Sequence, residues 1–169
     1  MIRRSLLAAA LVVAGSVAIA PKAMAQSVDV PFSGTVGGAC TFSSVTPGVL
    51  GVFGPVGTPT SLYASSFSGP GGPGMGSPGQ VSVACNQPAS LTVSLPVQTA
   101  GPAFIPMMLN ADVNSPQGST YNTTGGSGSP IPLLSDSTNI PLKIGMMADK
   151  GSVLEAGNYA YTVTLTVVP

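Results

Sequence analysis

Hydrophobic and polar residues alternate along several short stretches of the chain. In residues 159–168 almost every second side chain is aromatic or apolar, and the residues between them are mostly threonine. Residues 80–86 and 89–97 show the same period of two. Because successive side chains of a strand point to opposite faces, each stretch predicts a strand with one buried face.

Further short runs rich in strand-forming residues are expected to be strands: 39–45, 49–53, 61–68, 104–113 and 140–147. No segment has a sustained helical period, and 22 glycines and 17 prolines interrupt the chain. The pattern predicts an all-β sandwich. Residues 68–79 and 115–132, rich in glycine, proline and serine, are predicted to be loops.

Residues 1–25 have the pattern of a secretion signal. Arg3 and Arg4 precede an apolar run over residues 6–20, and Ala23-Met24-Ala25 forms a small-residue cleavage site. We therefore expect export through the Sec pathway and cleavage before Gln26. About 144 residues remain, enough for one domain.

Charge and cysteine content narrow the function classes. After removal of the signal, two lysines oppose five carboxylates, a net charge of −3 that disfavours binding to nucleic acid. Cys40 and Cys85 are the only cysteines, and the secreted context predicts that they form a disulfide.

No catalytic or metal site is predicted. The chain has no histidine, which excludes the common Ser-His and Cys-His nucleophile pairs and the usual zinc sites. A Ser-Lys dyad using Lys143 or Lys150 has no supporting context. Asp149 and Glu155 are interpreted as an acidic turn, and the Met107-Met108 and Met146-Met147 pairs as core filler. We expect a chain that is not an enzyme and needs no cofactor.

A further apolar alternation precedes the first cysteine. One of its faces carries apolar side chains and one glycine: Val28, Val30, Phe32, Gly34 and Val36. The opposite face is polar, so this one-sided strand needs an apolar surface to cover it. Gly37 and Gly38 follow at once and allow the segment to fold back or to pair elsewhere.

This stretch, Val30-x-Phe32-x-Gly34-x-Val36-x-x-Ala39-Cys40, resembles the N-terminal extension of chaperone-usher fimbrial (pilin) subunits. Two further matches are Val81-x-Val83-x-Cys85, as the strand with the second cysteine, and the closing strand that begins Gly157-Asn-Tyr159. Together they cover both ends and the middle of the mature chain.

The resemblance implies an immunoglobulin-like sandwich that lacks its final strand. A periplasmic chaperone and then the next subunit would supply that strand by addition to a sheet edge, with an outer-membrane usher assisting assembly at the cell surface. Residues 26–38 would be the donor extension and residues 39–169 the domain. The donor side chains would be those of the one-sided strand above. The acceptor groove would be lined by Tyr159, Tyr161, Val163, Leu165 and Val167.

A neighbouring family gives the alternative. Secreted proteins similar to spore coat protein U share much of this architecture, and a coat or matrix protein of that kind would use the N-terminal strand within its own domain. A carbohydrate-binding tip adhesin is disfavoured, because such tips usually carry an extra lectin domain and no donor extension.

Overall fold

The structure is a computed structural model that describes residues 31, 33–66, 76–135 and 137–169, so the predicted signal peptide lies outside it. The described residues form antiparallel strands and connecting segments, without a helix, which confirms the all-β class. The strands of these ranges are β1 (Cys40–Thr46), β2 (Gly51–Phe53), β3 (Ser61–Ala64), β4 (Gly79–Cys85), β5 (Ala89–Val93), β6 (Val97–Ala100), β7 (Met108–Ser115), β8 (Gly118–Thr123), β9 (Gly126–Ser127), β10 (Ile131–Leu133), β11 (Ser137–Asp149), β12 (Ala160–Thr162) and β13 (Leu165–Val168).

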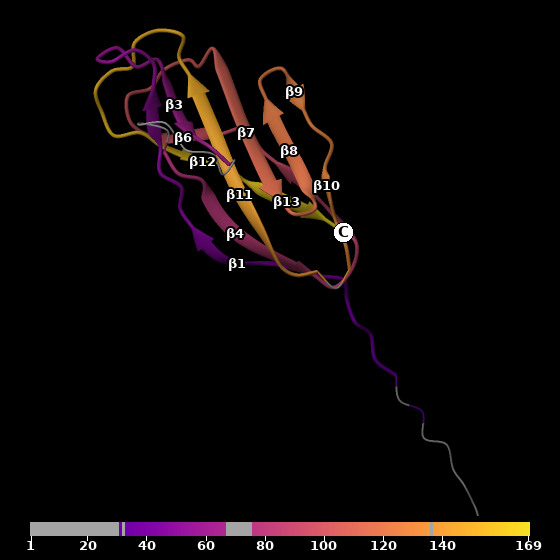
Figure 1. The fold of residues 1–169 in the computed structure, drawn as a ribbon. Coiled ribbons are helices and arrows are strands. Elements are labelled where there is room, and N and C mark those ends of the chain that lie inside the picture. Colours follow the sequence, from indigo (N-terminus) through magenta and orange to yellow (C-terminus); the bar gives the residue numbers. More distant parts are fainter. Residues whose placement is uncertain (1–30, 32, 67–75, 136) are drawn as a thin grey trace, which may run out of the picture. The chain divides into compact units, whose positions relative to one another are not determined.

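The larger sheet is built around the long strand β11 (Figure 1). Its order is β1-β4-β11-β7-β8-β9. The first half of β11 pairs with β4 as far as Ile144, and the second half pairs with β3 from Met146 onward. Strand β2 pairs with the other side of β3, and β1 with the other side of β4. Strands β1 and β2 therefore follow one another along the same edge of this sheet.

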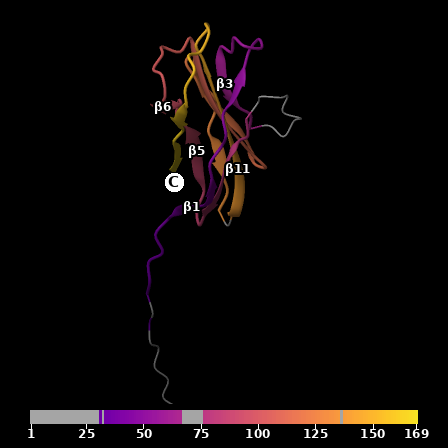
Figure 2. The same ribbon diagram turned by 90° about the vertical axis from the view of Figure 1, so that its left-hand side faces the viewer.

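The smaller layer consists of two pairings that continue one another. Strand β5 lies between β10 and β13, and β6, which follows β5, pairs with β12, which precedes β13. Figure 2 shows β5 and β6 in a layer separate from β3 and β11. Among the described residues, no strand pairs with the other side of β12 or β13, so these two strands form an open edge.

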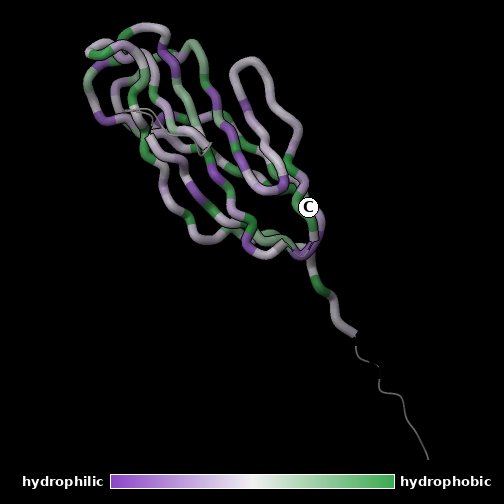
Figure 3. Tube along the Cα trace, viewed as in Figure 1, coloured by the Kyte–Doolittle hydropathy of each residue, from purple (hydrophilic) through white to green (hydrophobic). Residues whose placement is uncertain are grey.

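The main core lies between the two layers. Val83, Val113 and Leu142 of the larger sheet pack with Leu91, Ile131 and Leu133 of the smaller one. Figure 3 shows hydrophobic and hydrophilic residues alternating along the strands that supply these side chains. A smaller cluster contains Ala64, Met146 and Ala148. Val163 packs against both clusters and so marks the place where they meet.

The predicted disulfide is confirmed. Cys40 of β1 and Cys85 of β4 are paired directly across the two strands and bonded through their sulfur atoms. The bond closes a loop with a sequence separation of 45. On the chain-entropy model such a closure stabilises the fold by about 4 kcal/mol. It fixes the start of β1, which is the edge strand at that end of the larger sheet.

Two strands that the sequence predicts as continuous are broken in the middle. Residues 89–97 divide into β5 and β6, and residues 159–168 divide into β12 and β13. Pro96 has no backbone N–H and cannot continue the ladder at the first break. The two breaks face each other, because the Ser94 N–H donates to the Thr164 carbonyl at 2.9 Å.

The prediction of a loop over residues 115–132 is wrong. Strand β8 pairs with β7 over six residue pairs after a tight turn, with Gly118 at a positive φ of 141°. Strand β10 brings Ile131 and Leu133 into the core. Near the edge of a sheet a strand needs few apolar side chains, and only Thr120 of β8 is buried. Because β8 is mostly polar, the pattern of hydrophobic residues did not predict this strand. The other predicted loop, 68–79, lies largely outside the described residues.

Glycine is required where β11 changes partner. A Cβ at Gly145 would lie 2.7 Å from the Ser66 nitrogen and 2.6 Å from Asp112 Oδ1. Asp112 of β7 is the direct partner of Gly145 and accepts a hydrogen bond from the Ser66 hydroxyl. Burial raises the pKa of the Asp112 carboxyl above its ordinary value, and the Ser66 hydrogen bond offsets part of that increase.

Candidate functional site

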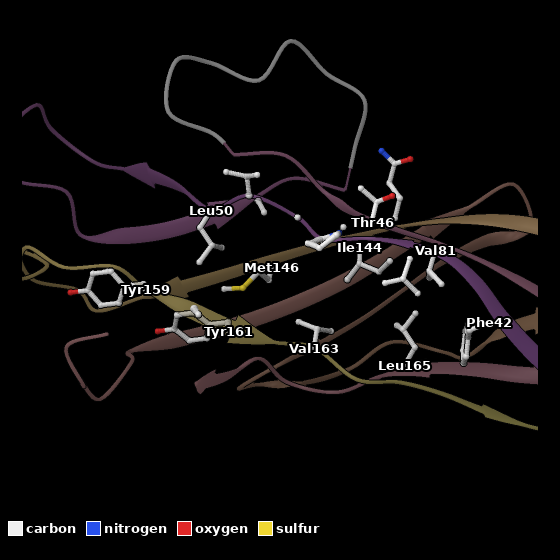
Figure 4. Close-up of a pocket in the computed structure, with 18 residues that line it drawn as sticks. Phe42, Thr46, Leu50, Val81, Ile144, Met146, Tyr159, Tyr161, Val163 and Leu165 are labelled. Atoms are coloured by element: carbon white, nitrogen blue, oxygen red, sulfur yellow. The ribbon is translucent and has the colours of Figure 1, made fainter. Parts of the chain in front are cut away.

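An open apolar groove of about 690 Å³ lies between the β1–β2 edge of the larger sheet and the β12–β13 edge of the smaller layer. The described residues that line it include no charged side chain. Figure 4 shows Tyr159, Tyr161, Val163 and Leu165 following one another along the groove, with Met146 and Ile144 beside them. We call this cavity the edge groove.

One wall of the edge groove comes from the last two strands. Tyr159, Tyr161, Val163 and Leu165 line it, four of the five residues that the resemblance assigns to an acceptor groove. These side chains are half-buried, while Thr162 and Thr164 between them are exposed. The fifth residue, Val167, packs against the main core and is not among the residues that line the groove.

The opposite wall comes from β1 and the segment leading to β2. It includes Phe42, Val45, Thr46, Val49 and Leu50. Val49 is fixed by two backbone hydrogen bonds with Ser77, at 2.7 and 2.9 Å. Glycine is needed nearby, since a Cβ at Gly48 would lie 2.7 Å from the Gly79 nitrogen. This wall therefore depends on close backbone packing against the segment that enters β4.

The floor is formed by the larger sheet. Ile144 and Met146 of β11 line the groove together with Val81 of β4 and Ala64 of β3. Met146 belongs to the smaller core cluster, and its flexible thioether can adjust to the shape of an occupant. The floor thus continues the core into a space that is open on one side.

The backbone beside the groove is as important as its side chains. Hydrogen bonds of an antiparallel ladder alternate, so neighbouring residues of a strand direct their N–H and C=O groups to opposite sides. The Thr164 carbonyl accepts from the Ser94 N–H, and the Thr166 carbonyl accepts from the Thr92 hydroxyl at 3.4 Å. The N–H and C=O groups of Val163 and Leu165 therefore point to the open edge. An unpaired edge of this kind is a template for another strand.

Tyr159 is held firmly at one end of the wall. Its hydroxyl donates a 2.7 Å hydrogen bond to the Glu155 carbonyl. The Phe104 ring packs edge-on against it, with ring centroids 6.1 Å apart. The Lys150 ammonium lies 6.0 Å from the centre of the Phe104 ring. These contacts fix the position at which the last strand enters the groove.

The electrostatics of the groove suit an uncharged apolar occupant. Burial raises the pKa of the Tyr161 hydroxyl, and the neighbouring Tyr159 raises it further. Within the described part of the chain, no group of three or more histidine, cysteine, aspartate or glutamate side chains is placed to hold a metal ion. The interpretation of the methionine pairs as core filler is correct for Met146, which is buried, and wrong for Met107, which is mostly exposed at a loop. The geometry favours binding of an extended apolar segment.

The proposed donor residues are only partly described. Val28, Val30 and Phe32 lie outside the described residues. Residues 33–39 are exposed and belong to no strand, and Val36 is 88% exposed.

Asn86 is a residue that sequence reasoning missed. It directly follows Cys85, and its side chain holds the segment that precedes Cys40 through hydrogen bonds to Gly37 and Ala39. The β1–β2 wall was also missed, because its residues come from the irregular second half of β1 and from the turn after it, neither of which has a regular period. An asparagine beside a disulfide and an apolar turn containing Gly48 were the only signals available.

No family model, curated protein or solved structure matches the chain. What the protein does is therefore inferred from the edge groove and from the residues that precede Cys40.

Proposed function

We propose that the chain is a structural subunit of a surface fimbria, and that its edge groove accepts residues 28–36 of another copy as an added strand. The observation that carries the proposal is the apolar groove beside the unpaired edge of β13. Strand addition of this kind combines main-chain hydrogen bonds with side-chain pockets, and the edge groove offers both.

Donor and acceptor have matching periods. Apart from Ala160 at the rim, the residues between 159 and 165 that line the groove recur at every second position, as do the apolar side chains of residues 28–36. Seven residues of a strand, such as 159–165 of the groove wall or 30–36 of the extension, span about 20 Å and place four side chains on one face. The open N–H and C=O groups of Val163 and Leu165 would pair with the backbone of the donor.

Gly34 supports an occupant role for this segment. It stands on the apolar face of the one-sided strand, at a position where the alternation would otherwise place an apolar side chain. A glycine on the apolar face of a strand would be needed where the strand meets a shallow part of a groove, because any side chain there would collide with the wall. We therefore assign the need for Gly34 to the bound state.

The fold that supports this function is an immunoglobulin-like sandwich without its last strand. Two antiparallel layers enclose one main core, and the Tyr159 hydroxyl bonds to a carbonyl four residues upstream. A tyrosine at the start of a late strand with this backbone hydrogen bond is a hallmark of immunoglobulin-like sandwiches. A donor strand beside β13 would occupy the missing position.

Burial of the donor side chains would supply the driving force for assembly. Burial of one valine or phenylalanine side chain contributes roughly 1.5–3 kcal/mol. Val28, Val30, Phe32 and Val36 together would therefore contribute about 6–12 kcal/mol before the cost of ordering the extension is subtracted. Main-chain pairing with the edge of β13 adds to this.

An uncovered groove needs protection before assembly. Val45 and Val49 expose apolar surface beside an unpaired strand edge, a combination that promotes aggregation. The proposal therefore includes a periplasmic chaperone that covers the groove in transit and an outer-membrane usher that exchanges it for the next subunit. Export would follow from the signal sequence in residues 1–25.

The test uses a domain of residues 37–169 and a synthetic peptide of residues 26–36. The peptide should increase the refolding yield of the domain and raise its melting temperature by mass action. A peptide with Gly34→Asn should fail, because the new side chain would collide with the groove. A matched peptide with Ser33→Asn, changed on the opposite face, should act like the original. Equal behaviour of the two altered peptides, or no effect of the original, would show that the donor assignment is wrong.

A further inference from the structure

We infer that Asn86 determines whose extension fills the edge groove. Its side chain holds residues 37–39 in an extended conformation, which prevents the extension of the same chain from folding back into the groove. The groove is then left to the extension of a second copy. This inference rests on the proposed function. It concerns the choice between assembly of copies and closure of a single chain.

Asn86 makes three hydrogen bonds to the segment before Cys40. The Ala39 N–H donates to Asn86 Oδ1 at 2.7 Å, and Asn86 Nδ2 donates to the Gly37 carbonyl at 2.9 Å. The Asn86 backbone N–H donates to the Ala39 carbonyl at 3.1 Å. Both ends of the side-chain amide are used. These bonds extend the pairing of β1 with β4 by one residue pair beyond the disulfide. We call this arrangement the Asn86 clamp.

The clamp directs the polar groups of Ala39 toward β4. Its N–H and its C=O both bond to Asn86. If a two-residue turn at Gly37 and Gly38 returned the chain along β1, Ala39 would become the first residue of the second strand. Its N–H and C=O would then have to face Val36 on the opposite side. The clamp and this turn exclude each other.

A three-residue turn meets the same obstacle. In the β1–β4 ladder, Cys40 follows Ala39, so its N–H and C=O face the open edge and are free to close such a turn. Residues 37–39 would then have to curve, whereas the clamp holds the Gly37 carbonyl and the Ala39 N–H in an extended form. Closure by either of the two shortest turns therefore breaks both side-chain hydrogen bonds of Asn86.

The clamp is needed because the backbone at this point is otherwise permissive. Gly37 and Gly38 can adopt the positive φ values that tight turns require. Without Asn86, a chain with its own donor segment three residues before β1 would readily form a hairpin. The effective concentration of a tethered segment exceeds that of a separate copy. Assembly between copies therefore requires a contact that keeps each extension from folding back into the groove of its own chain.

The size of the effect follows from the two side-chain hydrogen bonds. At their ordinary net strength, their loss would shift the balance between closed single chains and assembled copies by roughly 5- to 150-fold. Asn86→Ala removes both bonds. Asn86→Asp keeps the acceptor for the Ala39 N–H and loses the donor to the Gly37 carbonyl, so its effect should be intermediate. Ser119→Ala, at an exposed position of β8 that touches neither residues 37–39 nor the edge groove, serves as the control.

The experiment uses the full mature chain, residues 26–169, refolded over a wide range of concentrations. Size-exclusion chromatography separates assembled from single chains, and a fluorescent peptide of residues 26–36 reports whether single chains have an open groove. Wild type and Ser119→Ala should assemble increasingly with concentration, and their single chains should bind the peptide. Asn86→Ala should yield a several-fold larger fraction of single chains that persist at high concentration and do not bind the peptide.

The outcomes separate the inference from the proposed function. If wild type and Asn86→Ala assemble to the same extent while the peptide competes with assembly, strand donation stands and the role of Asn86 is refuted. If wild type itself forms closed single chains that exclude the peptide, the clamp does not oppose return and the inference fails. If the peptide binds no form of the protein and does not affect assembly, the proposed function fails first.

Discussion

Ser94 and Thr164 join the two strands of the smaller layer at the point where both of them break. The Ser94 N–H donates to the Thr164 carbonyl, and the Thr164 N–H donates to the Ser94 hydroxyl, each at 2.9 Å. The second bond replaces the main-chain partner that Thr164 would have in a regular ladder. It holds Val163 and Leu165, the residues on either side of Thr164, along the wall of the edge groove.

Ser94→Ala should therefore loosen the groove wall. The Thr164 N–H would lose its partner, and the free energy of unfolding should fall by about 1 kcal/mol. Binding of the peptide of residues 26–36 should weaken as well, because the edge on which it pairs becomes less ordered. Urea unfolding and peptide titration measure the two effects. Ser90→Ala, at an exposed serine of β5, is the control, and equal behaviour of the two variants would contradict the role given to Ser94.

Gly145→Ala should destabilise the domain by about 1–3 kcal/mol, the usual cost of overpacking. Its methyl group would lie within 3 Å of the Ser66 nitrogen and the Ala64 carbonyl oxygen, both of them backbone atoms that cannot rotate away. The control is Gly125→Ala, where the nearest atom, Thr123 Oγ1, lies 3.7 Å away. Thermal unfolding should separate the two variants, and a neutral Gly145→Ala would show that the strands tolerate separation at this point.

Asp112 should make stability fall as pH rises. Burial raises the pKa of the folded carboxyl above its ordinary value of 3.8, so between these two values the folded state holds more protons than the unfolded state. The free energy of unfolding therefore decreases as pH rises through this interval and stays lower above it. Asp112→Asn removes this term. The free energy of unfolding of the variant minus that of wild type should therefore be larger at about pH 7 than at about pH 3. Urea unfolding of both proteins measures this difference. A gap between the two proteins that is independent of pH would contradict the assignment.

The hydrophobic period predicted which side chains between Tyr159 and Leu165 share a face, because the alternation is local in the sequence and continues across the break between β12 and β13. That this face borders a groove was an implication of the resemblance. The opposite wall, with Val45, Val49 and Leu50, could not be predicted, since its shape depends on packing against Ser77 and Gly79, some thirty residues away. The disulfide followed from the export context alone. The polar strand β8 was not predicted, because it is stabilised by main-chain pairing with β7, and such pairing gives no hydrophobic pattern in the sequence.

Strand addition to the groove can be read directly from amide hydrogen exchange, residue by residue, on the domain of residues 37–169 with and without the peptide of residues 26–36. Strand addition to the edge of β13 predicts that the amides of Val163 and Leu165 exchange quickly in the free domain and become strongly protected when the peptide is bound. The amide of Thr166, which faces β5, should be protected in both states. If the peptide binds and the exchange of Val163 and Leu165 stays unchanged, the edge groove does not accept a strand and the account is contradicted.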